Sequence, residues 1–186
     1  MSPVENHFRW QGPGLYTGMC TTPISANTEA GGWQGLPPIE GLDPEDAVSG
    51  RFALLFPNTA VSILPNHAFV IRAIPEGPAG TVEETMILSH PESLASPDAE
   101  RELDQVASFW DLVNVQDVRI VERVQEGLSN PAYRGGRMCY RFEEPLHRYQ
   151  NMVVDRMVGI DRVPPGDDEP MRAMFGPAAH PEATAS

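Results

Sequence analysis

Short apolar segments separated by proline-containing turns characterise residues 51–90. Pro57-Asn58, Pro65-Asn66 and the run from Pro75 to Pro78 mark the turns. The segments between them are rich in β-branched and aromatic residues, which favour strands. The predicted strands span residues 51–56, 60–64, 67–74 and 80–89. Short strands that follow one another along the chain favour an antiparallel sheet.

A long helix is predicted over residues 97–128. Ser96 offers an N-cap, and Asn130-Pro131 closes the region. Residues 137–142 are then predicted to form a further strand, and residues 144–160 a second helix with one apolar face. Strands followed by a helix, a strand and a helix predict an α+β domain whose helices pack on one face of the sheet.

One apolar stripe runs along the long helix and contains a carboxylate. Its positions recur at steps of three and four residues, which is the spacing of a single buried helix face. They are Val106, Trp110, Val113, Asp117, Ile120, Val124 and Leu128. An ionised carboxylate on a buried face is costly unless a cation, a metal ion or several hydrogen-bond donors meet it.

Two explanations account for Asp117. Either it forms a structural pair with an arginine or caps a loop amide, or it is a metal ligand in the wall of a pocket. Asn114 lies one turn earlier on the same side, where it could hydrogen-bond Asp117 or face the same cavity. The stripe alone leaves both explanations open.

The two ends of the chain show little periodicity. Residues 1–50 are interrupted by glycines and prolines and are predicted to be irregular, either wrapping a partner surface or following structure that is absent here. Residues 161–186 hold five prolines and are predicted to form a disordered tail. The folded portion is therefore expected over residues 51–160.

Composition narrows the classes of function. The formal net charge of −13 argues against a nucleic-acid partner, which requires clustered Lys and Arg. No apolar run is long enough for a membrane span and the N-terminus has no secretory pattern, so we expect a cytoplasmic protein. Cys20 and Cys139 lack metal-ligand or redox spacing and are expected to be free thiols.

Several short motifs resemble one enzyme family. The segment from Phe109 to Leu128, with its Gln-Asp step, and the following Ser-Asn-Pro-Ala-Tyr are similar to the helix that carries the iron-binding aspartate in Rieske-type non-haem iron ring-hydroxylating oxygenase alpha subunits. Leu55-Phe-Pro-Asn58 and Ser89-His-Pro-Glu92 also fall in register with that family. The resemblance covers roughly residues 30–160 and points to the branch of choline, carnitine and glycine-betaine monooxygenases.

The resemblance implies a fold and a site. The catalytic domain would be a helix-grip fold (START/Bet v1-like), in which an antiparallel sheet curls around a long C-terminal helix, and this chain would hold an incomplete copy. Fe(II) would be bound by two histidines and one carboxylate, and Asp117 matches the carboxylate. A reductase or ferredoxin would supply electrons through a Rieske [2Fe–2S] cluster, and a small organic substrate would be hydroxylated or N-dealkylated with O₂.

The sequence departs from the family pattern at the other ligands. It contains neither the Cys-x-His and Cys-x-x-His pairs of a Rieske cluster nor the Asp-x-x-His-x-x-x-x-His-like segment that bears the iron histidines. We therefore expect the cluster and both histidines on a partner chain. This chain would then act only within a hetero-oligomer.

Three hypotheses stay open. In the first, this chain belongs to a split oxygenase and contributes Asp117 together with a substrate pocket that includes Asn114, Trp110, Val113 and Phe69. In the second, it is a non-catalytic helix-grip module that binds a small molecule or scaffolds a partner without iron. In the third, it is a truncated product without a function of its own.

Overall fold

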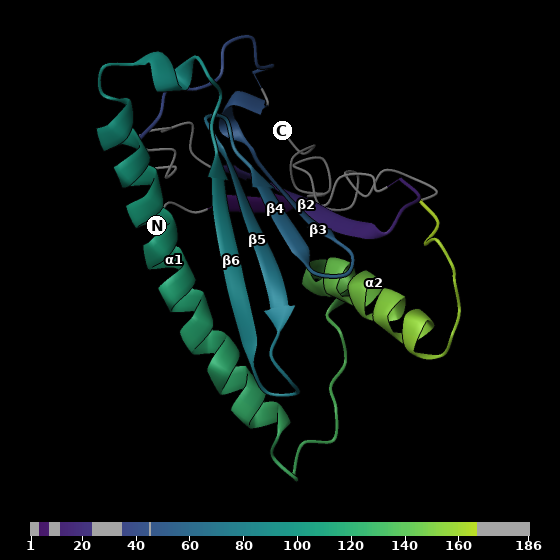
Figure 1. The fold of residues 1–186 in the computed structure, drawn as a ribbon. Helices are drawn as coiled ribbons and strands as arrows, with labels where there is room; N and C mark the ends of the chain where they lie inside the picture. Colours follow the sequence, from purple (N-terminus) through teal and green to yellow (C-terminus); the bar gives the residue numbers. More distant parts are fainter. Residues whose placement is uncertain (1–3, 8–11, 24–34, 45, 167–186) are drawn as a thin grey trace, which may run out of the picture.

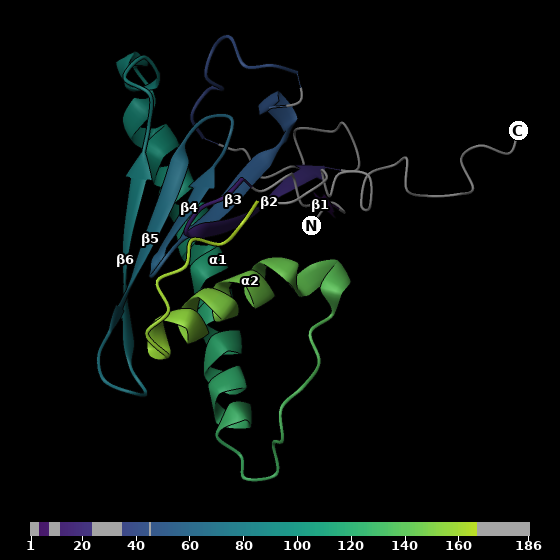
Figure 2. The same ribbon diagram turned by 90° about the vertical axis from the view of Figure 1, so that its right-hand side faces the viewer.

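The computed structural model describes residues 4–7, 12–23, 35–44 and 46–166. Within these residues the chain forms one antiparallel sheet and two α helices (Figure 1, Figure 2). The strands are β1 (Val4–His7), β2 (Tyr16–Pro23), β3 (Gly50–Leu55), β4 (Thr59–Ile63), β5 (Ala68–Pro75) and β6 (Thr81–Leu88). The helices are α1 (Ala99–Leu128) and α2 (Tyr140–Met157), with short 3-10 helices η2 (Asp46–Val48) and η3 (Ser93–Ala95). The predicted α+β class, with an antiparallel sheet and one long helix, is confirmed.

The strands of the sheet are ordered as they occur in the sequence, so each described strand pairs with the next. The longest ladder joins β5 to β6 over their whole length, beginning with Ala68 opposite Leu88. A hydrogen bond of 2.8 Å from the Glu76 amide to the Gly80 carbonyl closes the turn between them. The four strands predicted between residues 51 and 90 are confirmed to within one residue at each end.

Strands β1 and β2 correct the prediction that residues 1–50 are irregular. β2 pairs antiparallel with β3 along most of its length. Gly18 lies within β2, where a Cβ atom would come within 2.7 Å of the Phe52 carbonyl oxygen, so glycine permits this close approach. The surrounding glycines and prolines concealed a short run of strand-forming residues. Residues 24–34 of the predicted leader lie outside the described residues.

Helix α1 has 30 residues and runs beside β6 (Figure 1). A helix of this length measures about 45 Å. Glu100 and Glu102 in its first turn suit the positive end of the helix dipole. At the other end, the amide and hydroxyl of Ser129 both donate to the Gln125 carbonyl, at 3.0 and 2.8 Å. The long helix predicted over residues 97–128 is confirmed.

Helix α2 begins earlier than the sequence pattern indicated. The chain before Tyr140 is irregular, so the strand predicted over residues 137–142 is wrong, whereas the helix predicted over residues 144–160 is confirmed. The Glu143 carboxylate accepts a hydrogen bond of 2.5 Å from the Cys139 amide, which satisfies a free donor at the helix start. This cap and the continuous amphipathic helix that follows override the local strand propensity.

The core receives side chains from the sheet and from both helices. Its buried apolar residues are Leu36, Leu64, Phe69, Val106 and Met152. Gly35 has a φ of +99°, and a Cβ atom there would lie 2.6 Å from the Glu102 carbonyl oxygen and from the Val106 side chain. The segment at Gly35 and Leu36 therefore packs directly against the first turns of α1.

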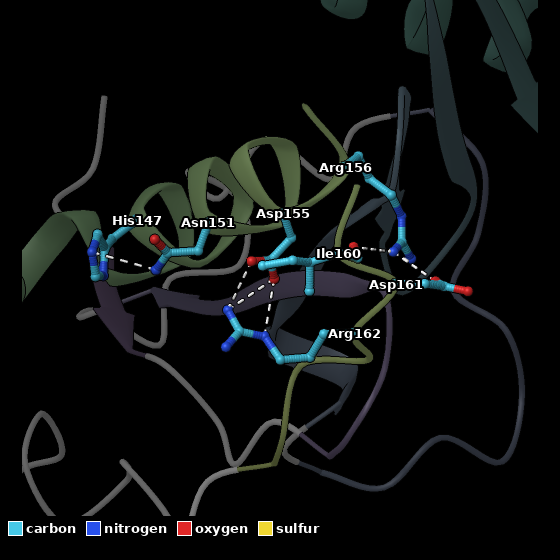
Figure 3. A network of polar contacts seen from close by, with 7 residues as sticks. All are labelled: His147, Asn151, Asp155, Arg156, Ile160, Asp161 and Arg162. Carbon is cyan, nitrogen blue, oxygen red and sulfur yellow. Dashed lines mark hydrogen bonds and ion pairs between the residues drawn. The ribbon is translucent and has the colours of Figure 1, made fainter. Parts of the chain in front are cut away.

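After α2 the chain reverses direction and runs back along the helix (Figure 3). Gly159, with a φ of +78°, makes the reversal. Arg162 then donates two hydrogen bonds of 3.0 Å to the buried Asp155 carboxylate, in a fork-to-carboxylate pair (Figure 3). Arg156 pairs with Asp161 at 2.6 Å and fixes the start of this return segment.

The return segment corrects part of the predicted tail. Residues 161–166 are irregular but bonded to the rest of the chain, for example through the Pro164 carbonyl, which accepts from the Gly14 amide at 3.2 Å. Residues 167–186, where the rest of the disordered tail was predicted, lie outside the described residues.

Arg148 joins α2 to the start of β2 and to the return segment. Its guanidinium donates to the carbonyl of Tyr16 at 2.9 Å and to that of Pro165 at 2.8 Å. It also donates to the carbonyls of Gly12 and Gly14, both at 3.3 Å. Several acceptors around one cation suit the rigid, multiple donors of arginine.

Replacing Arg148 by alanine is expected to lower the free energy of unfolding by about 2 kcal/mol, because its carbonyl partners lose a charged donor. Arg148→Lys should recover only part of the loss, since one ammonium group cannot reach all the acceptors. Urea denaturation measures the change. The exposed Arg119→Ala is the control and should cost less than about 0.5 kcal/mol. Equal losses in both variants would contradict this role of Arg148.

Candidate metal and substrate site

The apolar stripe of α1 is buried only near the start of the helix. Val106 is 1% exposed, whereas Ile120, Val124 and Leu128 are 59%, 53% and 49% exposed. The predicted single buried face is therefore correct for the first turns and wrong for the half that follows Asp117. Successive residues of an α helix are turned by about 100° around its axis. The exposed half of the stripe therefore points about 90° away from the surface of α1 that faces the β5–β6 turn. The described part of the sheet does not cover these stripe residues.

Trp110 ties α1 to the sheet. Its indole stacks on Phe69 of β5, with ring centroids 4.1 Å apart and planes 9° from parallel. Its Nε1–H donates a hydrogen bond of 2.7 Å to Nε2 of His67, which immediately precedes β5. These contacts end the well-packed part of the helix.

Buried hydrogen bonds determine the protonation of His67. Asn66 donates through Nδ2 to the Leu36 carbonyl at 2.8 Å, so its Oδ1 is an acceptor. This oxygen accepts from Nδ1–H of His67 at 2.7 Å, which leaves Nε2 with the lone pair that Trp110 needs. His67 is 3% exposed, and its burial lowers the pKa of the imidazole from 6.5 to about 4. The ring is therefore neutral at pH 7.

An open groove of about 670 Å³ lies between α1 and the β5–β6 turn. The turn and the start of β6 form one wall. The α1 wall consists of Asp117, Val118, Val121, Glu122 and Gln125. Around the helix axis, Asp117 lies at the edge of this wall that is nearest to the exposed apolar stripe. It therefore borders both the groove and the stripe.

Asp117 is exposed in this chain, so the predicted burial of its carboxylate is not observed. Among the residues that the structure describes, no arginine pairs with it and no amide or hydroxyl donates to it. The explanation of Asp117 as a structural ion pair or cap thus finds no partner there. Glu83 and Glu122 also line the groove and cannot neutralise a third carboxylate.

The four predicted pocket residues form two groups. Trp110 and Phe69 pack on each other, while Val113 and Asn114 are half-buried on α1 between Trp110 and Asp117 in the sequence. None of the four is among the described residues that line the groove, and their contact with a substrate stays a prediction. The β5–β6 turn was missed as a wall because its glycines and prolines carry no functional group that would single it out.

Within the described residues, no three His, Cys, Asp or Glu side chains gather into a metal site. His7 lies in β1, His90 and His147 are exposed, and His180 lies outside the described residues. A facial iron centre needs two histidines beside its carboxylate. The described residues therefore do not form a complete facial iron centre, and the role of Asp117 as a metal ligand stays a prediction.

Comparison with known proteins identifies the family. Residues 2–159 match the family described as "Ring hydroxylating alpha subunit (catalytic domain)". The chain belongs to this family. Ring-hydroxylating alpha subunits typically use mononuclear iron and receive electrons through a reductase or ferredoxin. The resemblance inferred from the motifs around Asp117 is confirmed.

One curated relative of this ring-hydroxylating alpha-subunit chain is the glycine betaine monooxygenase oxygenase subunit of Chromohalobacter salexigens. The two are 30% identical over 120 residues, which cover 64% of this chain and 26% of the relative. The chain thus matches about a quarter of the length of that relative.

Neither described helix combines the length and apolar character needed to cross a bilayer.

The neutral state of His67 predicts how stability depends on pH. The folded pKa of about 4 lies below the unfolded value of 6.5, so the unfolded chain binds an extra proton between these pH values. The free energy of unfolding therefore keeps its full value, as far as His67 is concerned, above pH 6.5. It falls by up to about 3 kcal/mol as the pH is lowered to 4.

His67→Gln, which keeps an acceptor but does not titrate, should lack this part of the pH dependence. Urea unfolding at several pH values between 4 and 7 measures the difference from the wild type. The exposed His90→Gln is the control and should keep the wild-type profile. A His67→Gln profile as steep as the wild-type one would show that His67 is not held neutral.

Proposed function

We propose that this chain contributes the carboxylate iron ligand, Asp117, and part of the substrate pocket to a Rieske-type oxygenase. The Rieske cluster and the two iron histidines lie outside these 186 residues, on a partner chain. A reductase or ferredoxin delivers the electrons, and a small organic substrate is hydroxylated or N-dealkylated with O₂. The completed domain has the helix-grip fold, with its sheet curled around α1.

The position of Asp117 is the observation that carries this proposal. The family match covers α1, and the Gln-Asp step at Asp117 resembles the sequence around the family's iron-binding aspartate. In the described structure its carboxylate is free and borders a groove large enough for a small organic molecule. When bound, Fe(II) with two histidines and a carboxylate supplies open coordination positions for oxygen chemistry.

The exposed apolar stripe supports a partner on the same side of α1. Ile120, Val124 and Leu128 are each about half exposed on consecutive turns, next to Asp117. An apolar stripe of this kind is stable when another surface covers it. A partner seated on the stripe would also reach the free carboxylate, so one interface could complete both the core and the metal centre.

The groove supports a cationic organic molecule as the substrate class. The described residues that line it include Asp117, Glu83 and Glu122 but no lysine or arginine. The relative from Chromohalobacter is named for glycine betaine, a quaternary ammonium compound. Glu83 and Glu122 would attract such a cation electrostatically after Asp117 has taken up the iron.

Fe(II) content tests the proposed function directly. The chain is prepared without oxygen, alone and co-expressed with the product of a neighbouring gene that encodes the Rieske and histidine motifs. We expect iron only in the complex, and its loss in Asp117→Ala because the facial site then lacks its carboxylate. Asp111→Ala, an exposed acid on another face of the same helix, should retain iron.

Iron that is indifferent to Asp117→Ala would overturn the assignment. Absence of iron from every preparation would favour the alternative, a subunit that binds a small molecule or scaffolds a partner without iron. Binding of a quaternary ammonium compound to the iron-free chain, measured by calorimetry, would then support that alternative over an inert fragment.

The interface prediction is tested by a charge on the stripe. Ile120→Glu should weaken the complex at least about tenfold, since it places an unpaired charge in an apolar contact. Val115→Glu adds the same charge at a similarly exposed apolar residue on the opposite face of α1 and should leave affinity nearly unchanged. Analytical ultracentrifugation of the chain with its partner measures both. Equal affinities for the two variants would place the partner elsewhere.

A further inference from the structure

Within the part of the chain that the structure describes, helix α1 is firmly packed only near its start. Its first turns pack against Gly35, Leu36 and β5, and most side chains beyond Trp110 are exposed. Asp117 follows seven residues later, which corresponds to about 10.5 Å along the helix axis. A tilt of about 6° at Trp110 would therefore move the carboxylate by about 1 Å. The last firm contact of the helix controls where Asp117 lies.

Trp110 and Asp117 also share one face of the helix. Seven residues make nearly two full turns, so their side chains differ by only about 20° in direction. A contact that fixes the rotation of α1 at Trp110 consequently fixes the direction of the carboxylate. Two described contacts act there, namely the stack on Phe69 and the hydrogen bond to His67.

The hydrogen bond gives the more specific constraint. Stacked rings can slide in their common plane at little cost. The hydrogen bond from Trp110 to His67, with 2.7 Å between its two nitrogen atoms, has one favoured direction. The acceptor is itself held, because His67 donates to Asn66 and Asn66 donates to the Leu36 carbonyl. His67, Asn66 and Leu36 are 3%, 1% and 1% exposed, so water does not compete for these bonds.

We propose that His67 is a positioning residue for Asp117. As a neutral imidazole protonated on Nδ1, it accepts the Trp110 N–H and thereby sets the rotation and tilt with which α1 presents the carboxylate at the groove. The use of that carboxylate as an iron ligand rests on the proposed function, but its placement does not.

The placement is measured on the full chain without iron. Cys20 and Cys139 are replaced by serine, and nitroxide labels are attached at Asp117→Cys and at Ile63→Cys, on the exposed end of β4. Pulsed electron paramagnetic resonance gives the distribution of distances between the labels. We expect one narrow distance in this background and its loss, as a broad or shifted distribution, in His67→Leu.

Three further variants separate positioning from stability. His67→Gln places an amide oxygen where Nε2 accepts, so it should restore the narrow distance. Trp110→Phe keeps an aromatic ring against Phe69 but removes the donor, and should broaden the distribution as His67→Leu does. Met152→Ala empties a buried site on α2, outside the hydrogen bonds of His67, and should lower stability while leaving the distance narrow.

The inference is overturned if His67→Leu keeps the narrow distance, or if Met152→Ala broadens it equally. The same variants, without labels, are then assayed for Fe(II) in the complex, where His67→Leu should lose affinity and His67→Gln should recover it. A complex without iron would refute the proposed function. The label distances would still decide whether His67 positions Asp117.

Discussion

The hydrogen bond from Trp110 to His67 is the contact on which the geometry of α1 depends. It is the last well-packed contact before the exposed half of the helix, and both of its partners are held by other buried groups. Loss of either partner would leave a buried polar atom unsatisfied, at a cost of about 1–3 kcal/mol. His67, in the short turn before β5, therefore determines the direction of α1, although the second half of the helix lies beyond this contact.

The exposed half of α1 follows from the same arrangement. The sheet contacts the helix near its start and leaves a groove beside Asp117. Three stripe residues beyond that point are about half exposed. Covering a large apolar side chain contributes about 1.5–3 kcal/mol, so the stripe can supply much of the affinity for a partner. Under the proposed function, binding of one partner would complete both the apolar core along α1 and the metal site.

Local patterns predicted the elements better than their packing. Turn residues delimited the strands between residues 51 and 90, and the three-and-four spacing identified α1 with its unusual Asp117. Periodicity reports that a helix face is apolar, but the surface that covers it can belong to another molecule. The stripe was therefore correct as a pattern, but the described residues bury only its first half. The role of His67 could not be predicted, since it depends on Asn66 and Trp110, which only the tertiary fold brings together.

The exposure of Asp117 is consistent with a site that two chains share. In water a single carboxylate competes poorly for Fe(II), because the Coulomb attraction is small at high dielectric. A partner that brings two imidazoles and also covers the stripe would exclude water and strengthen each ligand bond. Binding of iron and binding of the partner would then be coupled, and each would raise the affinity of the other by the same factor. Such coupling would keep the isolated chain free of iron and confine the oxygen chemistry to the assembled enzyme, which is where the electrons arrive.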